Sequence, residues 1–217
     1  MDAADSVAIS FHPITPASAR ALATWRYPPP YATYDITSAP EAMDEMLDAR
    51  SPWFIAFDSA GAPMGYCCFG TAAEVGWEGN PRLWTIGDKT VSVGLGLRPD
   101  LTGQHLGLPY VETVLSFAAK RFAPEAFRLF VLPFNQRAIR VYERAGFQYV
   151  GERIAPDTGS DATVFLEMRR DVTMAPNLDT PPRKSGKFSV LWGCLRNLSP
   201  KGLPGPLYVP SGVVVAV

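Results

Sequence analysis

A glycine-flanked stretch, Thr102-Gly-Gln-His-Leu-Gly107, stands between a run of Val and Leu residues and a long amphipathic segment. The first turn of a helix presents unpaired N–H groups and the positive end of the helix dipole, and glycine lets a phosphate approach the backbone. This pattern therefore indicates an anion-binding helix start, with His105 as a candidate phosphate contact. A tight strand-to-helix connection would explain Gly103 and Gly107 equally well. The stretch lacks the Gly-Lys-Ser/Thr ending of a Walker A loop, so it does not indicate a nucleoside triphosphate site with Mg²⁺.

A second group of residues follows about thirty positions later, in the pattern Asn135-x-x-Ala-x-x-x-Tyr142-x-x-x-Gly-Phe147. Asn135 stands where an N-cap residue would begin a helix. Tyr142 falls on the apolar face of that helix, where a buried aromatic residue serves the core more often than catalysis. Gly146 suits the left-handed position that ends a helix. Each residue alone has a structural explanation, so the chemical interpretation depends on the two patterns occurring together.

Both patterns depend on the elements that position them. Hydrophobic alternation and β-branched runs predict strands over residues 7–11, 53–57, 64–69, 91–97, 127–132, 147–152 and 163–168. Helical periodicity and start signals predict helices over residues 17–26, 40–47, 106–122 and 135–145. Gly94 and Gly96 interrupt the strand before the anion-binding stretch, which predicts a bulge or the close approach of a ligand to its backbone. The alternation of strands and helices predicts an α/β fold.

The composition narrows the classes of function. The chain has 217 residues, of which 47% are hydrophobic, and 20 basic side chains nearly balance 21 acidic ones, so we expect no nucleic-acid or membrane partner. Three cysteines and two histidines do not suggest a disulfide framework or a His-rich metal site, and we predict no metal. The acidic start and the lack of an apolar run of about 20 residues predict a cytoplasmic protein.

The chain changes character near residue 172. All predicted elements lie in residues 1–172, which we interpret as one domain. Residues 173–217 are rich in proline and lose their periodicity, so we predict a flexible extension. The extension is not purely polar, and docking of residues 187–195 on the domain or on a partner stays open.

Together, the two patterns and their spacing resemble the GNAT (Gcn5-related) N-acetyltransferase superfamily, and the chain looks like a bacterial-type single-domain member. The resemblance is most specific over residues 91–152, and it extends to residues 7–170 because the preceding strand–helix–helix–hairpin order is that of the family. It implies a mixed, mostly antiparallel central sheet with flanking helices and one splayed strand pair. In this family the pantetheine arm of acetyl-CoA lies between the parted strands and bonds to the backbone like an additional strand.

The resemblance also implies which residues bind acetyl-CoA. The family's pyrophosphate motif has a long polar side chain and a glycine where this chain has Thr102 and His105, but a cradle of backbone amides does not depend on those side chains. Leu95 and Leu97 would offer backbone groups to pantetheine and to the acetyl carbonyl, where an N–H stabilises the developing oxyanion. The full set implied for the cofactor is Leu95, Leu97, Gly103, Gln104, His105, Leu106, Gly107, Asn135 and Ala138.

For catalysis, the resemblance gives Tyr142 the role of protonating the departing thiolate. The family often uses a carboxylate on or beside the splayed strand as general base, and residues 91–94 carry none. Glu74 and Glu78, from the segment before that strand, are our candidates for a base that acts through water. As alternatives, both are solvated loop acids, or ordered water and backbone carbonyls remove the proton. The region expected to face the acceptor is aromatic and comprises Trp25, Tyr27, Tyr31 and Tyr34.

The sequence thus predicts an acetyl-CoA-dependent N-acetyltransferase, a monomer or homodimer, that moves acetyl directly to a primary amine in a ternary complex. The acceptor is a small-molecule amine or the N-terminus of a peptide or protein. The alternative is a CoA-binding sensor or interaction module without turnover, which the departures at Thr102 and His105 and the missing strand carboxylate favour. Cys67 and Cys68 do not suggest a covalent route, because a hairpin strand favours them as small core residues.

Overall fold

The computed structural model describes residues 8–49, 52–75, 89–155, 163–172 and 215–216. Its helices are α1 (Pro16–Leu22), α2 (Pro40–Leu47), α3 (Gly107–Phe122) and α4 (Gln136–Arg144). Short 3₁₀ turns form η1 (Tyr31–Tyr34), η2 (Gly70–Ala73) and η4 (Pro99–Leu101). The strands are β1 (Ser10–Pro13), β2 (Trp53–Phe57), β3 (Pro63–Phe69), β4 (Thr90–Leu97), β5 (Ala126–Val131), β6 (Gln148–Ala155), β7 (Thr163–Asp171) and β8 (Val215–Ala216).

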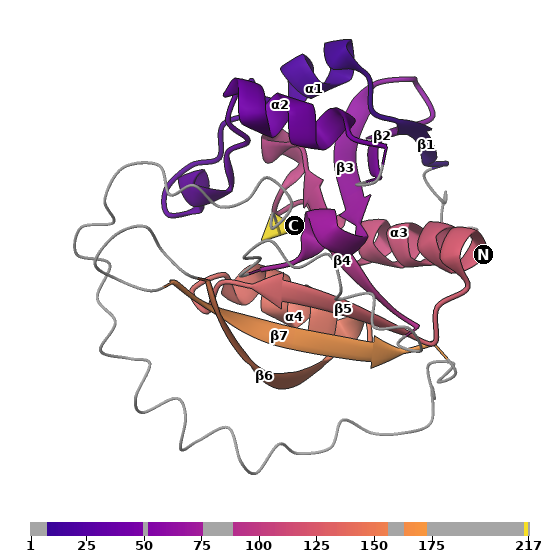
Figure 1. The fold of residues 1–217 in the computed structure, drawn as a ribbon, viewed down its shortest axis with the longest axis vertical. Coiled ribbons are helices and arrows are strands. Elements are labelled where there is room, and N and C mark those ends of the chain that lie inside the picture. The colour runs from indigo at the N-terminus through magenta and orange to yellow at the C-terminus, as the bar shows by residue number, and fades with distance from the viewer. Residues whose placement is uncertain (1–7, 50–51, 76–88, 156–162, 173–214, 217) are drawn as a thin grey trace.

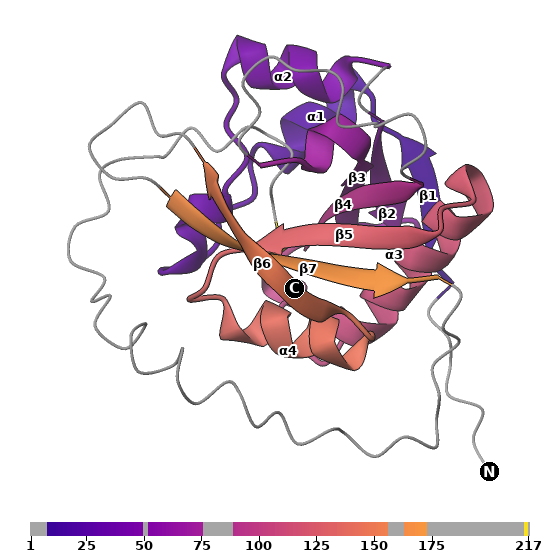
Figure 2. The ribbon, with the colours of Figure 1, turned by 60° about the horizontal axis from the view of Figure 1, so that its bottom comes forward.

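The strands form one sheet in the order β1-β2-β3-β4-β5-β7-β6, and β8 joins it by pairing with β4. All neighbours along this order are antiparallel except β4 and β5, which are parallel. Helices α1 and α2 lie on one side of the sheet, and α3 and α4 lie on the other (Figures 1 and 2). This arrangement confirms the predicted α/β class with a mixed, mostly antiparallel sheet.

The pair β4 and β5 is splayed, as the sequence predicts. The two strands form three parallel residue pairs, the last between Ser92 and Arg128, and among their described residues no pair follows. We call the diverging part, residues 93–97 of β4 and 129–131 of β5, the β4–β5 fork. Along the same stretch, the opposite edge of β4 stays paired with β3. The sheet is therefore open on only one side of β4.

Two apolar cores hold the sheet to its helices. The core beneath α3 and α4 contains the side chains of Leu95, Val111 and Tyr142. The core beneath α1 and α2 contains Leu22, Met46 and Tyr66 among others. Successive side chains of a strand point to opposite faces, so β4 contributes to both sides of the sheet, and all of its residues are buried. Cys67 and Cys68 are buried core residues, as predicted.

Helix α1 is shorter than the sequence predicts. It begins with a capping box between Thr15 and Ser18, with a proline in its first turn, and it ends at Leu22 rather than at residue 26. Beyond it, the backbone N–H of Tyr27 donates to Oδ1 of Asp35 at 2.8 Å. The Asp35 side chain thus accepts from the backbone N–H of Tyr27, which in a longer helix would donate to a backbone carbonyl one turn earlier. Periodicity alone does not reveal such a competitor.

Only residues 215–216 of the predicted proline-rich extension are described. They form β8, which pairs in parallel with Leu95 and Gly96 of β4. The expected flexibility of residues 173–214 and the docking of residues 187–195 fall outside the described residues, as does Glu78. Within the described ranges, no helix is long and apolar enough to span a membrane.

Candidate active site

In the β4–β5 fork, an edge of β4 in the middle of the sheet is not paired with β5, and at Leu95 and Gly96 this edge pairs with β8. Leu95 and Leu97 are each 1% exposed and place their side chains in the core beneath α3 and α4. Because the N–H and C=O groups of a strand point sideways within the sheet, a ligand in the fork would meet backbone rather than side chains. The Leu97 carbonyl already accepts a hydrogen bond from the Tyr27 hydroxyl at 2.6 Å. The carbonyl of Leu97, one of the two residues predicted to offer backbone groups to the cofactor, therefore already has a hydrogen-bond partner within the protein.

The predicted anion-binding stretch forms an exposed turn at the start of α3. Gly103 and His105 have positive φ angles of 77° and 62°. Helix α3 begins at Gly107, and the side chain of its N-cap residue, Leu106, makes no capping hydrogen bond. The Gln104 side chain folds back, donating from Nε2 to the Asp100 carbonyl at 2.6 Å. The helix start therefore presents N–H groups that the N-cap side chain leaves free for an anion.

His105 stands where the family motif has a glycine, and its backbone has a left-handed conformation. A φ of 62° is the region that glycine enters at no steric cost and that other residues rarely adopt. His105 thus keeps a backbone angle that suits the family's glycine. Its side chain is exposed, so it lies at the surface of the turn rather than filling it.

Arg137, which the sequence analysis missed, brings positive charge to this turn. Its guanidinium carbon lies 4.3 Å from the ring centroid of Tyr31. Its Nη1 is 3.8 Å from the position that a Cβ on Gly103 would occupy. A guanidinium beside uncapped helix N–H groups strengthens an anion site. The sequence did contain one sign of such a role. Arg137 lies in the first turn of the predicted helix, where a positive charge is unfavourable beside the positive end of the helix dipole.

Asn135 caps α4 and connects the two sides of the predicted site. Its Oδ1 accepts from the backbone N–H of Ala138 at 3.2 Å, and its Nδ2 donates to the Tyr34 hydroxyl at 3.2 Å. Asn135 is 1% exposed and Ala138 is fully buried. The capping interpretation is confirmed, and a residue expected at the cofactor thereby holds one expected at the acceptor.

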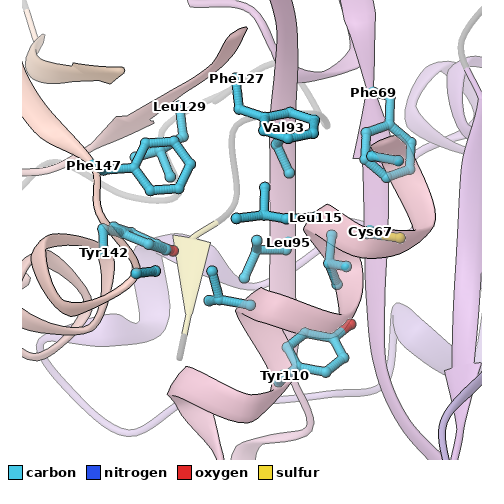
Figure 3. Close-up of a cluster of buried hydrophobic side chains, with 14 of the residues drawn as sticks. Cys67, Phe69, Val93, Leu95, Tyr110, Leu115, Phe127, Leu129, Tyr142 and Phe147 are labelled. Atoms are coloured by element: carbon cyan, nitrogen blue, oxygen red, sulfur yellow. The ribbon is translucent and has the colours of Figure 1, made fainter. Parts of the chain in front are cut away.

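Tyr142 places a buried hydroxyl beside the fork. The residue is fully buried in the core beneath α3 and α4, and its hydroxyl has no hydrogen-bond partner among the described residues. In Figure 3 the hydroxyl oxygen points away from α4 toward the side on which Leu95 and β8 lie. Burial raises its pKa well above the ordinary value, with a smaller contribution from nearby Tyr34. The phenol therefore stays protonated and keeps a proton to donate.

Glu74 reaches the splayed strand although it lies outside it. The chain leaves η2 at Glu74, whose carboxylate is 5% exposed and accepts hydrogen bonds from Ser92 of β4 and from Arg128 of β5. The Arg128 Nε also donates to Ser92 Oγ at 3.1 Å, which closes the group. The buried carboxylate of Glu74 thus lies at the Ser92–Arg128 pair, the last residue pair before the fork. The sequence prediction identified Glu74 but not the partners that position it.

The predicted acceptor residues gather on the α1–α2 side of the sheet. Tyr27 and Tyr34 are buried, while Trp25 and Tyr31 are half-buried. Tyr31 also lies 5.9 Å, centroid to centroid, from Phe134, which is 38% exposed. These rings come from the turn before α2 and from the loop before α4. All four predicted residues belong to the core beneath α1 and α2 or pack against it.

Two further aromatic residues were missed. Tyr66 and Trp53 stack with centroids 5.6 Å apart, and among the described residues the Tyr66 hydroxyl and the Trp53 indole nitrogen have no hydrogen-bond partner. A Cβ on Gly96 would lie 2.6 Å from the Tyr66 hydroxyl, so Tyr66 covers β4 where glycine leaves room. Aromatic residues in a strand are ordinary core residues, and nothing in the sequence distinguishes these two.

No group of His, Cys, Asp and Glu side chains within the described ranges is arranged to hold a metal ion. Two polar groups lie at the fork, the phenol of Tyr142 (Figure 3) and, at the Ser92–Arg128 pair, the carboxylate of Glu74, and the start of α3 follows β4 in the chain. An acid, a base candidate and an anion cradle around a backbone edge suit acyl transfer from a phosphorylated carrier.

Comparisons with known proteins support this chemistry. A family model described as the acetyltransferase (GNAT) domain matches residues 9–148. No curated protein matches the chain at a significant level. Among solved structures, an aminoglycoside acetyltransferase AAC(6′)-Ib in complex with coenzyme A has a TM-score of 0.58 and 20% identity, over 76% of this chain and 96% of that one.

Two further structures show the same fold. A chimera of the spermidine N-acetyltransferase SpeG from Vibrio cholerae and hSSAT has a TM-score of 0.54 and 13% identity, over 75% of this chain and 95% of that one. A putative phosphinothricin N-acetyltransferase has a TM-score of 0.53 and 17% identity, over 76% and 98%. At these identities, the structural likeness concerns the fold.

Proposed function

The chain belongs to the GNAT acetyltransferase family, and on this premise we propose that it moves acetyl from acetyl-CoA directly to a primary amine in a ternary complex. The observation that carries the proposal is the β4–β5 fork, where pairing ends at Ser92 and a backbone edge opens in the sheet. The acceptor is a small-molecule amine or the N-terminus of a peptide or protein. The similar structures include a spermidine and an aminoglycoside acetyltransferase, which is consistent with an amine acceptor.

Each part of acetyl-CoA, from the pyrophosphate through pantetheine to the acetyl group, has proposed binding residues near the fork. The exposed turn from Gly103 to Gly107 and the guanidinium of Arg137 would hold the pyrophosphate. The β4 backbone near Leu95 would bond to the amides of pantetheine as a neighbouring strand does. A backbone N–H there would also stabilise negative charge that develops on the acetyl oxygen. In this arrangement the thioester would lie near Tyr142.

Tyr142 is the proposed acid. As the amine nitrogen bonds to the acetyl carbon, the carbon–sulfur bond breaks and Tyr142 donates its phenolic proton to the departing sulfur. The phenolate then regains, through water, the proton that the nitrogen loses as it becomes an amide. Its hydroxyl is buried without a partner, so a donor is available there. Its raised pKa would make the phenol a weaker acid. The same apolar surroundings raise the pKa of a thiol, however, so the transfer remains balanced.

Glu74 is the proposed base. An incoming ammonium must lose a proton before attack, and the carboxylate of Glu74 stands at Ser92, beside the last pair before the fork. The proton would reach Glu74 through water. The Arg128 guanidinium holds the carboxylate in place. Glu78 remains the second candidate for this role.

The proposal predicts thiol release that depends on an amine. The purified protein, incubated with acetyl-CoA and a panel of amines and N-terminal peptides, should release free CoA thiol with at least one acceptor. Tyr142→Phe should lower kcat about 100-fold, because general acid catalysis contributes about that much or more, and should leave CoA affinity unchanged. Tyr149→Phe, which removes a phenol from β6, is the matched control and should keep wild-type kcat. CoA binding without thiol release on any acceptor would favour the module without turnover.

Glu74→Gln separates a base from a structural role. The amide keeps the shape and can still accept from Ser92, but it cannot take a proton. We expect kcat at neutral pH to fall about 100-fold, as is typical for loss of a general base. The loss should shrink as the pH rises, because more of the acceptor is then already the neutral amine. A reduction that is the same at every pH would instead assign Glu74 to positioning.

A further inference from the structure

The fork holds a segment of the protein itself. Residues 215–216 form β8, which pairs in parallel with Leu95 and Gly96. Over residues 93–97 the opposite edge of β4 is bonded to β3, so β8 must use the edge that faces β5. Figures 1 and 3 show β8, in yellow, at this central position rather than at the rim of the sheet. β8 also contacts η1, which carries Tyr31 and Tyr34 of the acceptor side.

The physical reason for this pairing is the burial of β4. Every residue of β4 is buried, and a buried backbone N–H or C=O without a partner costs about 1–3 kcal/mol. Where β5 diverges, the groups of β4 that faced it lose their partners. An extended segment restores them without any requirement on its side chains. The edge of the fork is thus a site for an extended chain of amide groups.

We propose that residues 215–216 occupy the fork in the free protein and that acetyl-CoA must displace them to bind. This inference rests on the proposed function, in which pantetheine bonds to the same edge near Leu95. A strand edge accepts one neighbour at a time, so the two ligands exclude each other. Displacement of β8 also releases its contact with η1, which couples entry of the cofactor to opening of the acceptor side.

Val215→Pro tests the competition in the full chain. Proline removes the backbone N–H of residue 215 and fixes φ near −65°, which disfavours a strand pair. Val215→Ile keeps the N–H and the β-branched side chain, so it is the matched control. CoA affinity would be measured by calorimetry on wild type and both variants. If β8 fills the fork in about nine molecules of ten, freeing it should lower the CoA dissociation constant about tenfold.

Hydrogen exchange gives a second readout that does not depend on affinity. Amides of residues 93–97 should exchange faster in free Val215→Pro than in wild type or Val215→Ile. Adding CoA to wild type should accelerate exchange in the peptide that contains residues 215–216. Equal CoA affinity in all three proteins, together with unchanged exchange at residues 215–216, would overturn the competition while leaving the proposed function intact. Failure of CoA to bind any of the three would overturn the proposed function and the competition with it.

Discussion

Along its β3 side, β4 forms five antiparallel residue pairs, from Val93 with Phe69 to Leu97 with Gly65. Along its β5 side it forms three parallel pairs and then parts from its neighbour. The same strand, with the same run of Val, Leu and Gly, thus has one closed edge and one open edge. The difference lies in what covers each edge.

The closed edge is sealed by glycines and phenols. A Cβ on Gly65 would lie 2.5 Å from the Tyr110 hydroxyl and 2.7 Å from the Gly96 carbonyl oxygen, so these atoms approach as closely as glycine allows. The Tyr110 hydroxyl donates to the Tyr66 carbonyl at 2.7 Å. On both edges one buried hydroxyl lacks a partner among the described residues, that of Tyr66 over Gly96 and that of Tyr142 beside the fork. The comparison teaches that tight packing on one side fixes β4, while on the other side, where β5 parts from it, only the two-residue strand β8 pairs with it.

The largest effect should come from ionising the buried phenols on both edges at once. Burial raises the pKa of five tyrosines, Tyr27, Tyr34, Tyr66, Tyr110 and Tyr142. Above about pH 10 these phenols ionise in the unfolded chain but not in the fold, so the stability present below that pH is lost as the pH rises, by about 1.4 kcal/mol per pH unit for each phenol. Five together amount to about 7 kcal/mol per unit, which rivals the whole stability of a domain.

We therefore expect cooperative alkaline unfolding before about pH 12. Phenolate absorbance and far-UV circular dichroism, followed together, should change in one transition. Gradual ionisation of all the tyrosines near their ordinary pKa, with the dichroism retained, would contradict the tight packing on which the comparison depends.

A smaller effect should come from forcing the closed edge apart. Gly65→Ala places a methyl group against Tyr110 and against the backbone of Gly96, neither of which can move without disturbing the other. Overpacking of this kind costs about 3 kcal/mol in the free energy of unfolding, measured by urea denaturation. Gly151→Ala is the matched control, because nothing lies within 4 Å of its added Cβ. Equal stability of the two variants would show that the β3 edge is not tight.

The sequence predicted the open edge better than the closed one. Gly94 and Gly96 predicted a bulge or the close approach of a ligand, but β4 keeps a regular register with β3 there and the Tyr66 ring lies over Gly96. Asn135 and Tyr142 resembled a family pattern that implies a parted pair. The resemblance supplied the fork, because local periodicity does not report which neighbouring strand diverges. The predicted cap at Asn135 and its helix were confirmed.

The remainder depended on contacts between distant residues. Asn135 meets Tyr34 across 101 positions, and Ser92 meets Glu74 across 18. Neither the spacing nor the residue types reveal such pairs in a single sequence. Arg137 was missed for the same reason, since only the fold places it beside Gly103. The end of α1 at Leu22 was missed because Asp35 takes a backbone donor from outside the local pattern.

The smallest effect compares two phenols in the same core. Tyr110→Phe removes the donor to the Tyr66 carbonyl and should lower the free energy of unfolding by about 1 kcal/mol. Tyr142→Phe removes a hydroxyl without a described partner, so its unfolding free energy should stay within about 0.5 kcal/mol of wild type or rise. Urea denaturation at neutral pH measures both. If Tyr142→Phe loses as much stability as Tyr110→Phe, the Tyr142 hydroxyl is already bonded in the free protein. Tyr142 would then not offer an unused donor to a ligand in the fork.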